Sequence, residues 1–187
     1  MRPLALALAL PLVGCTAVTD SPFDLLVTNG GTETVYVQAG ESSGVLVGIS
    51  EQIDGEWVRL ATSLSGLCAP RCSDPPGFGA IACADAAAEF LIPHALLPGD
   101  SASRSYDGEL WYLAPRGCAR KAPGVGPFRG NVCHDRVALD QNGEEIDEPA
   151  ASGPVGSFDE EVFLPAPVCE EIEFSFEDGV GEIVIEG

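Results

Sequence analysis

The chain has 187 residues, of which 45% are hydrophobic, so it is long and apolar enough to bury a core and is not a disordered stalk. Its 29 acidic residues outnumber its 9 basic residues, giving a formal net charge of −20. Such a charge repels nucleic acid and anionic lipid headgroups, so we expect no nucleic-acid partner. It can attract cations or basic proteins, but solubility at a crowded surface is the preferred explanation of the charge.

The chain begins with the segment MRPLALALALPLVGC. Arg2 supplies a minimal positive start, and the stretch from Leu4 to Val13 is apolar and uncharged. This stretch is far shorter than the about 20 residues that a membrane-spanning helix needs. A short apolar stretch behind a positive start is typical of a secretory signal peptide, so residues 1–14 are predicted to be one.

The end of this segment, Leu12-Val13-Gly14-Cys15, resembles the lipobox of bacterial lipoproteins. That motif has an aliphatic residue, a small or β-branched residue, Gly or Ala, and then an obligatory Cys. The resemblance implies that diacylglycerol is attached to the thiol of Cys15 and that a peptidase cuts just before it. The alternative is an ordinary signal peptide that happens to end near a cysteine.

A lipid on Cys15 would localise the protein to a membrane. Buried acyl chains contribute about 0.8 kcal/mol per CH₂, so a lipidated amino terminus would make the membrane a permanent partner. The next residue is Thr16; the Asp that usually retains lipoproteins in the inner membrane is absent. We therefore expect residues 15–22 to be a lipidated tether at the outer membrane of a bacterial cell envelope, on its periplasmic face or at the cell surface.

The remaining cysteines point to disulfide bonds. The chain has seven cysteines, and assigning Cys15 to lipid leaves an even set: Cys68, Cys72, Cys83, Cys118, Cys133 and Cys169. An even number of cysteines in an exported protein indicates disulfides, because the compartment outside the cytoplasm is oxidising. The sequence leaves their pairing open.

Residues 23–187 are predicted to form one all-β domain, a single antiparallel β-sandwich. Strand-like runs are expected first at residues 23–28, 34–38, 45–49 and 57–60. Asn29-Gly30-Gly31 and Asp54-Gly55 separate them and predict turns. Short strands at this regular spacing favour a sandwich over alternating strands and helices.

The middle and end of the chain are less regular. Residues 63–100 are predicted to form a disulfide-stapled loop insertion. Within it we expect a short helix over 82–91, which Pro93 ends, and a turn at Leu97-Pro98-Gly99-Asp100. The other expected elements are strands at 103–106, 110–113, 134–139, 172–176 and 182–185, a loop at 114–130, an acidic exposed loop at 144–160, and turns at Asn142-Gly143 and Asp178-Gly179. The run Ile172 to Phe176 alternates apolar with polar residues, which predicts one buried and one wet face.

Three features together resemble immunoglobulin-like modules of the intracellular proteinase inhibitor type found in bacteria. They are the turn led by Asn29, the Gly55-x-Trp57 hairpin, and the Leu97–Asp100 turn that leads to Trp111. The resemblance covers residues 23–113 and implies an immunoglobulin-like sandwich. The cysteine-rich insertion and the acidic loop depart from that family, and fold does not imply function. Protease inhibition is therefore only an alternative.

One segment matches the pattern of a catalytic serine. Ser42 lies in Gly40-Glu41-Ser42-Ser43-Gly44, which fits G-x-S-x-G. The nucleophile elbow requires a strand, a strained turn and then a helix. A β-like run, Val45 to Ile49, follows the serine instead, so we interpret the segment as a loop between antiparallel strands.

The only histidines, His94 and His134, are the candidates for metal binding. His94 could join Cys68, Cys72 and Cys83 in a metal site, and His134 could join Cys133. Export favours disulfide bonding of these thiols instead. Asp140-x-Asn142-Gly143-Glu144-x-x-Asp147 resembles part of a calcium loop, yet it has Gly in the fourth position where an EF-hand needs it in the sixth. A Ca²⁺ site of less regular geometry, formed by the carboxylates of the acidic loop, is therefore kept as an alternative.

The sequence thus predicts a non-enzymatic binding or structural lipoprotein of the cell envelope, with no cofactor and with an envelope protein as a candidate partner. The alternative is an exported hydrolase or metal-handling protein that uses Ser42 or the pair His94 and His134. No ligand can be named from the sequence.

Overall fold

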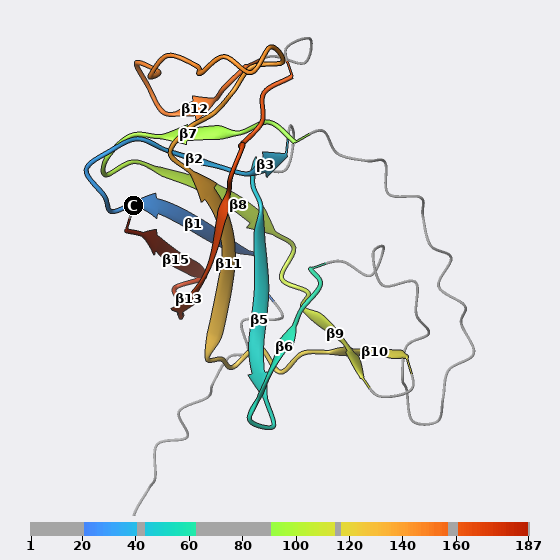
Figure 1. Ribbon diagram of the computed structural model, residues 1–187. Helices are drawn as coiled ribbons and strands as arrows, with labels where there is room; N and C mark the ends of the chain where they lie inside the picture. Colours follow the sequence, from blue (N-terminus) through green and yellow to red (C-terminus); the bar gives the residue numbers. More distant parts are fainter. Residues whose placement is uncertain (1–20, 41–43, 63–90, 115–116, 157–160, 187) are drawn as a thin grey trace, which may run out of the picture.

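The computed structural model describes residues 21–40, 44–62, 91–114, 117–156 and 161–186. Within these ranges the chain forms strands and turns, so the protein is all-β as predicted (Figure 1). The described residues contain no helix long and apolar enough to cross a membrane. The strands are β1 (Phe23–Asn29), β2 (Val35–Val37), β3 (Ala39–Gly40), β4 (Gly44–Val45), β5 (Val47–Ile53), β6 (Glu56–Arg59), β7 (His94–Leu96), β8 (Ser101–Tyr106), β9 (Trp111–Ala114), β10 (Cys118–Lys121), β11 (Phe128–Asp135), β12 (Gly153–Pro154), β13 (Val168–Phe174), β14 (Phe176–Glu177) and β15 (Val180–Ile185).

The four-stranded sheet contains both ends of the domain. Its strand order is β14-β15-β1-β8. β1 pairs antiparallel with β8 but parallel with β15, from Asp24 opposite Val180 to Asn29 opposite Ile185. The expectation of purely antiparallel sheets is therefore wrong at this pair, because the first and last strands run side by side in the same direction.

The seven-stranded sheet is built around β11. Its order is β12-β7-β2-β11-β5-β6, with β13 on the other side of β11. β11 pairs with β5 over Phe128–Val132 and with β2 at His134 and Asp135. Two small two-stranded sheets, β9 with β10 and β3 with β4, complete the described architecture.

The two larger sheets share one apolar core. The residues of β1 and β15 alternate between buried and less buried positions, as the period of a strand requires. Leu25 and Ile183 from the four-stranded sheet cluster with Val37, Ile49 and Val132 from the seven-stranded sheet, and all five are at most 1% exposed. Fully burying one such side chain contributes about 1.5–3 kcal/mol, so this cluster is the main stabilising element of the fold.

Aromatic rings close one end of this core. Phe23 stacks on Tyr106 and meets Phe176 edge-on, with ring centroids 4.9 and 4.7 Å apart. Phe128 and Phe174 stack at 5.7 Å, and Phe176 contacts both of them. These rings come from both sheets, so they fix the sheets against each other at this end.

A second apolar cluster lies on the opposite side of β2 and β7. Tyr36 and Ala95 pack there against Ala138, Val155 and Val162, with Ile146 and Leu164 alongside. Burial, followed by the charges of Glu148 and Glu145, raises the pKa of Tyr36. The described part of the acidic loop is thus not only an exposed loop: its carboxylates face solvent while Ile146 and Val155 pack inward.

Two predicted hairpin turns are confirmed. Asp54 and Gly55 both have positive φ, 53° and 86°, between β5 and β6. Asp178 and Gly179 do the same, at 50° and 82°, between β14 and β15. Two successive residues with positive φ match the twist of the flanking strands, which is why Asp-Gly is favoured there.

Three further expectations were wrong. The segment 114–130 is not only loop, because it contains β10 and the start of β11. The strand expected at 134–139 ends at Asp135, and β7, at 94–96, was not expected. The sequence does not predict the start of β11, because Gly130 lies between Phe128 and Val132 on its buried side and weakens the apolar pattern. The helix expected at 82–91 lies outside the described residues.

Candidate functional site

The residues expected to carry function fall into two groups. Cys15, Cys68, Cys72, Cys83 and Ser42 lie outside the described residues. Cys118, Cys133, Cys169, His94 and His134 lie within them. All three described cysteines are disulfide-bonded, which confirms the disulfide prediction for this part of the chain.

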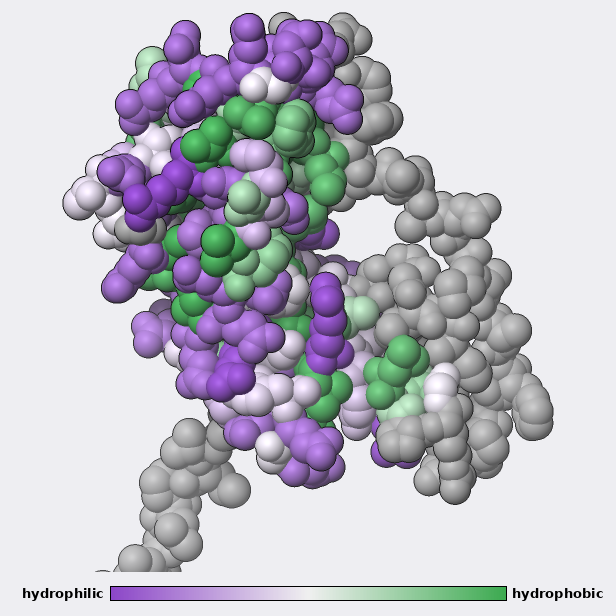
Figure 2. All heavy atoms as spheres, viewed as in Figure 1, coloured by the Kyte–Doolittle hydropathy of each residue, from purple (hydrophilic) through white to green (hydrophobic). Residues whose placement is uncertain are grey.

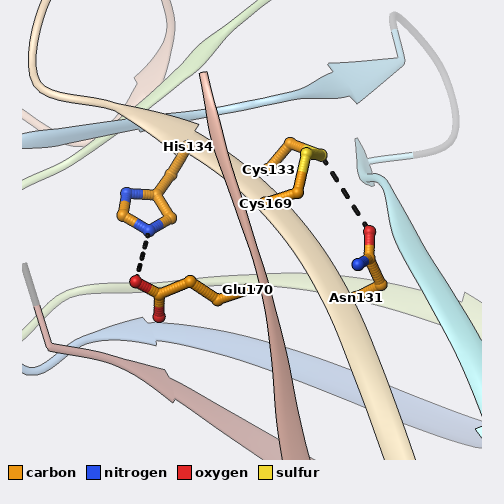
Figure 3. The surroundings of a disulfide bond; sticks show 5 residues. All are labelled: Asn131, Cys133, His134, Cys169 and Glu170. Atoms are coloured by element: carbon orange, nitrogen blue, oxygen red, sulfur yellow. Dashed lines mark hydrogen bonds and ion pairs between the residues drawn. A yellow bond between two sulfur atoms is a disulfide. The ribbon is translucent and has the colours of Figure 1, made fainter. Parts of the chain in front are cut away.

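Cys133 and Cys169 bond to each other across neighbouring strands (Figure 3). Cys133 of β11 lies directly opposite Cys169 of β13, and their Cα atoms are 4.0 Å apart. Sγ of Cys133 is 4.0 Å from Oδ1 of Asn131, two residues earlier on the same strand. The bond therefore ties an edge strand to the central strand of the seven-stranded sheet, on the outer face of that sheet.

His134 lies on the other face of β11, because successive side chains of a strand alternate. Its Nε2 atom is 3.4 Å from Oε1 of Glu170, an ion-pair distance without hydrogen-bond geometry (Figure 3). Its Nδ1 atom is buried and has no hydrogen-bond partner among the described residues. Because Cys133 is oxidised, it cannot serve as a thiolate metal ligand beside His134.

His94 and His134 lie in one row across three strands. Val37 of β2 is opposite His94 of β7 on one side and His134 of β11 on the other. Val37 is fully buried and separates the two imidazoles. Burial lowers the pKa of His94, which favours its neutral form. Across the described residues no group of three His, Cys, Asp or Glu side chains is placed to hold a metal ion.

The segment that resembles a calcium loop is a tight turn. Oδ1 of Asp140 accepts hydrogen bonds from the backbone N–H groups of Asn142 and Glu144, both at 2.8 Å. These hydrogen bonds lower the pKa of Asp140. A neighbouring hollow of about 400 Å³ is lined by Asp140, Gln141, Asn142, Ile146, Gly156, Glu161 and Val162. The Asp140 carboxylate thus holds the turn together.

The residues on either side of Ser42 pair as neighbouring strands. Gly40 of β3 is opposite Gly44 of β4 in an antiparallel ladder. The described strands on either side of Ser42 are thus antiparallel neighbours, whereas a nucleophile elbow leads from a strand to a helix.

Sequence reasoning missed a buried carboxylate, Glu51 of β5, which is 0% exposed. Its Oε1 atom accepts hydrogen bonds from the backbone N–H groups of Val125 and Gly126, at 2.9 and 3.2 Å. Its Oε2 atom has no described partner. Glu51 therefore holds the loop that leads into β11 against the sheet.

Sequence reasoning also missed an ordered patch of side chains on the outer surface of the seven-stranded sheet, which we name the polar face. It comprises Glu171 and Glu173 of β13, Arg129 and Asn131 of β11, Gly48, Ser50 and Gln52 of β5, and Trp57 and Arg59 of β6. Figure 2 views this side of the molecule, where hydrophilic residues predominate over the lower parts of β5 and β11. Only the strand register brings these residues together, so no sequence motif marks them.

Arg129 is the centre of the polar face. Its Nε and Nη2 atoms donate to Oε1 of Glu173 at 3.2 and 2.8 Å, and its Nη1 atom is 3.8 Å from Glu171. Its guanidinium group lies over the ring of Trp57, with Cζ 3.9 Å from the ring centroid. Charge-assisted hydrogen bonds and the cation–π contact together fix both side chains.

No family model matches the chain, and neither a curated protein nor a solved structure is significantly similar to it. Its function must therefore be inferred from its own chemistry. Among the described residues, the polar face is the place where ordered polar and aromatic side chains meet solvent.

Proposed function

We propose that the chain is an exported lipoprotein of a bacterial cell envelope, anchored by lipid on Cys15, whose β domain is a binding or structural module rather than an enzyme. The short apolar segment that ends in Leu12-Val13-Gly14-Cys15 carries the anchor proposal. The oxidised state of Cys118, Cys133 and Cys169 supports export, because disulfides persist outside the cytoplasm. Thr16 after the cysteine favours the outer membrane.

The finer fold assignment, an immunoglobulin-like sandwich, is part of this proposal. Two sheets that share one apolar cluster, and a first strand that lies beside the last, support it. A crystal structure of the chain would test it. A strand order that differs from that of immunoglobulin-like domains would contradict it.

The non-enzymatic role rests on the arrangement of the reactive candidates. The residues that flank Ser42 pair as antiparallel strands, and Val37 separates His94 from His134. By contrast, Trp57, Arg129 and Glu173 form an ordered surface network, which suits binding. Labelling by a serine-reactive fluorophosphonate that is lost in Ser42→Ala would contradict this role.

Metabolic labelling with an alkyne fatty acid tests the anchor. We expect the expressed chain to incorporate the label and to fractionate with membranes. Cys15→Ser should lose at least about tenfold of the label and become soluble, because acyl chains supply the membrane affinity. Thr16→Ala, which leaves Cys15 intact, is the matched control and should keep the label. A Cys15→Ser chain that stays labelled and membrane-bound would refute the anchor.

A further inference from the structure

We propose that the outer edge of β13, the side of this strand that faces away from β11, binds an extended basic segment of a partner protein as an additional strand. This inference rests on the proposal that the domain is a binding module, and it names the class of partner. It is argued from the pairing of β13, the direction of its backbone groups and the charge of the edge.

β13 pairs on one side only. It is antiparallel to β11 over all seven of its residues, and no other described strand pairs with it (Figure 1). The strands at the two ends of the same sheet, β6 and β12, have only four and two residues. An unpaired strand edge carries a row of N–H and C=O groups that another extended chain can bind. β13 therefore offers the longest such edge in the described part of this sheet.

The register decides which backbone groups of β13 point away from β11. Opposed residues of an antiparallel pair alternate between hydrogen-bonded and non-hydrogen-bonded pairs, with Cα atoms about 5.5 and 4.5 Å apart. The Cα atoms of Cys133 and Cys169 are only 4.0 Å apart. The carbonyl oxygen of Cys133 accepts from the N–H of Gln38, which follows β2. Cys133 and Cys169 are thus a non-hydrogen-bonded pair, so the N–H and C=O groups of Cys169 point to the outer edge.

The alternation repeats along β13. The N–H and C=O groups of Glu171 and Glu173 also point to the outer edge, whereas Glu170 and Ile172 bond to β11. No described residue forms a hydrogen bond with the backbone N–H groups of Cys169, Glu171 or Glu173. All three residues are exposed. The outer edge thus presents alternating donors and acceptors to solvent, as a partner strand requires.

The outer edge is extended before a partner binds. The Cys133–Cys169 bond attaches β13 to the central strand of the sheet. On the outer face, Arg129 donates to Glu173 across the same two strands at 2.8 Å. Ordering a segment on binding weakens affinity, so a strand that is already fixed binds with a smaller loss of entropy.

The carboxylates of β13 favour a basic partner. The side chains of Glu170, Glu171 and Glu173 are 40, 61 and 62% exposed, and Arg129 offsets only part of their charge. Like charges on opposed strands destabilise the pair, whereas opposite charges stabilise it. A second copy of this chain, with a net charge of −20, is therefore repelled. A strand with Lys or Arg at alternate positions is attracted.

Amide hydrogen exchange, followed by NMR on the full chain in a zwitterionic detergent, tests the proposal. In the free chain we expect the amides of Glu170 and Ile172 to be protected and those of Glu171 and Glu173 to exchange quickly. The probe is a capped peptide of four Lys-Thr repeats, which matches the length of a strand. It should bind with a dissociation constant on the order of 0.1 mM and slow exchange at Glu171 and Glu173 at least about tenfold.

Two further probes separate strand pairing from attraction between charges. Spermine matches the charge of the peptide but has no peptide groups, so it should leave exchange at Glu171 and Glu173 unchanged. A peptide of four Glu-Thr repeats can form a strand but carries the opposite charge. It should bind at least about tenfold more weakly than the Lys-Thr peptide.

Two substitutions at one position locate the binding edge. Glu171→Gln and Glu171→Pro both remove the charge, but only proline also removes the outward N–H, and edge strands tolerate proline there. We expect Glu171→Gln to weaken binding about twofold to threefold and Glu171→Pro at least about tenfold. Glu144→Gln is the matched control, because Glu144 is an exposed carboxylate outside β13. It should leave the affinity unchanged.

The proposal is overturned if the Lys-Thr peptide leaves exchange at Glu171 and Glu173 unchanged, or if spermine slows that exchange equally. Both outcomes need only the parent chain, so they decide the proposal even if Glu171→Pro does not fold. Equal binding of the Glu-Thr peptide, equal affinities of a folded Glu171→Pro and Glu171→Gln, or an equal loss in Glu144→Gln would also overturn it.

The anchor and the strand partner fail separately. A chain that incorporates the fatty-acid label and fractionates with membranes, but binds no Lys-Thr peptide, would refute this inference alone. A chain that binds the peptide at the outer edge of β13 but incorporates no label would refute the anchor alone.

Discussion

Asn29 shows how one side chain can fix a connection between sheets. It is 0% exposed, and its Nδ2 atom donates to the backbone oxygens of Glu33 and Leu96, both at 2.8 Å, while its Oδ1 atom accepts from Gly31 N. It therefore joins the β1–β2 turn to β7. A buried amide with these partners is costly to remove, because each group left unpaired loses its hydrogen bond without regaining water.

We predict that Asn29→Ala lowers the free energy of unfolding by about 2–3 kcal/mol, since the buried carbonyl of Leu96 and the part-buried carbonyl of Glu33 and N–H of Gly31 lose their partner. Asn142→Ala is the matched control: Asn142 is exposed and bonds only within the Asp140 turn, so its loss should stay within about 0.5 kcal/mol. Urea denaturation of both variants measures the difference. Equal stabilities would show that the Asn29 hydrogen bonds are not the stabilising feature.

His94 makes the stability depend on pH. Burial lowers its pKa from the ordinary value of 6.5, so the folded state prefers the neutral imidazole. Its contribution is therefore fully present above pH 6.5 and is lost as the pH falls below that value toward the folded pKa. We predict that His94→Gln flattens the fall in unfolding free energy over that range. An NMR titration of the His94 ring in the folded chain should give a pKa below 6.5, and a value at or above 6.5 would contradict the prediction.

At the scale of elements, β11 and β13 form the pair on which the outer face depends. They are joined over seven opposed pairs, from Phe128 with Phe174 to His134 with Val168, and by the Cys133–Cys169 bond. The bond closes a loop with a sequence separation of 36 residues, which restricts the unfolded chain.

We predict that the double variant Cys133→Ala and Cys169→Ala lowers the free energy of unfolding by about 3–4 kcal/mol, as loop-closure entropy suggests. The backbone ladder should survive, so amides of β11 should stay protected in hydrogen exchange under native conditions. Loss of that protection would mean that the disulfide, and not the ladder, holds β13 in place. An unchanged stability would contradict the prediction itself.

The sequence predicts those elements whose signal is local. The strands expected at 23–28 and 182–185, and the Asp-Gly turns, depend on neighbouring residues only, and the structure confirms them as β1, β15 and two hairpin turns. β11 was placed wrongly because Gly130 interrupts its apolar side. The parallel pairing of β1 with β15 and the polar face depend on residues far apart in the chain, which single-sequence patterns do not register. For the same reason the sequence could not single out the partner of Cys133.

At the scale of the whole molecule, the two larger sheets approach each other closely at Gly130. A Cβ atom there would lie 2.2 Å from Cδ1 of Ile183, which is fully buried on β15. Gly48 lies in the same sheet but faces outward, where a Cβ atom would have ordinary contacts at 3.4 Å. Gly130 therefore lies on the side of the sheet that faces the core, and Gly48 lies on the outer side.

We predict that Gly130→Ala costs about 1–3 kcal/mol of stability, because the core must shift to accept a methyl group. Gly48→Ala should be neutral or slightly stabilising, since alanine loses less backbone entropy than glycine. Thermal unfolding of both variants measures the difference in stability. If Gly130→Ala were tolerated as well as Gly48→Ala, the sheets would not pack as closely as described.

The most direct test of the central claim is the intact mass of the chain purified from membranes without reductant. A lipoprotein predicts a chain that begins at Cys15, lacks residues 1–14 and carries the added mass of a diacylglyceryl group and an N-acyl chain. It also predicts that the other six of the seven cysteines are oxidised, with no thiol that reacts with an alkylating agent. A mass without lipid, or a chain that begins at another residue, would contradict the anchored lipoprotein.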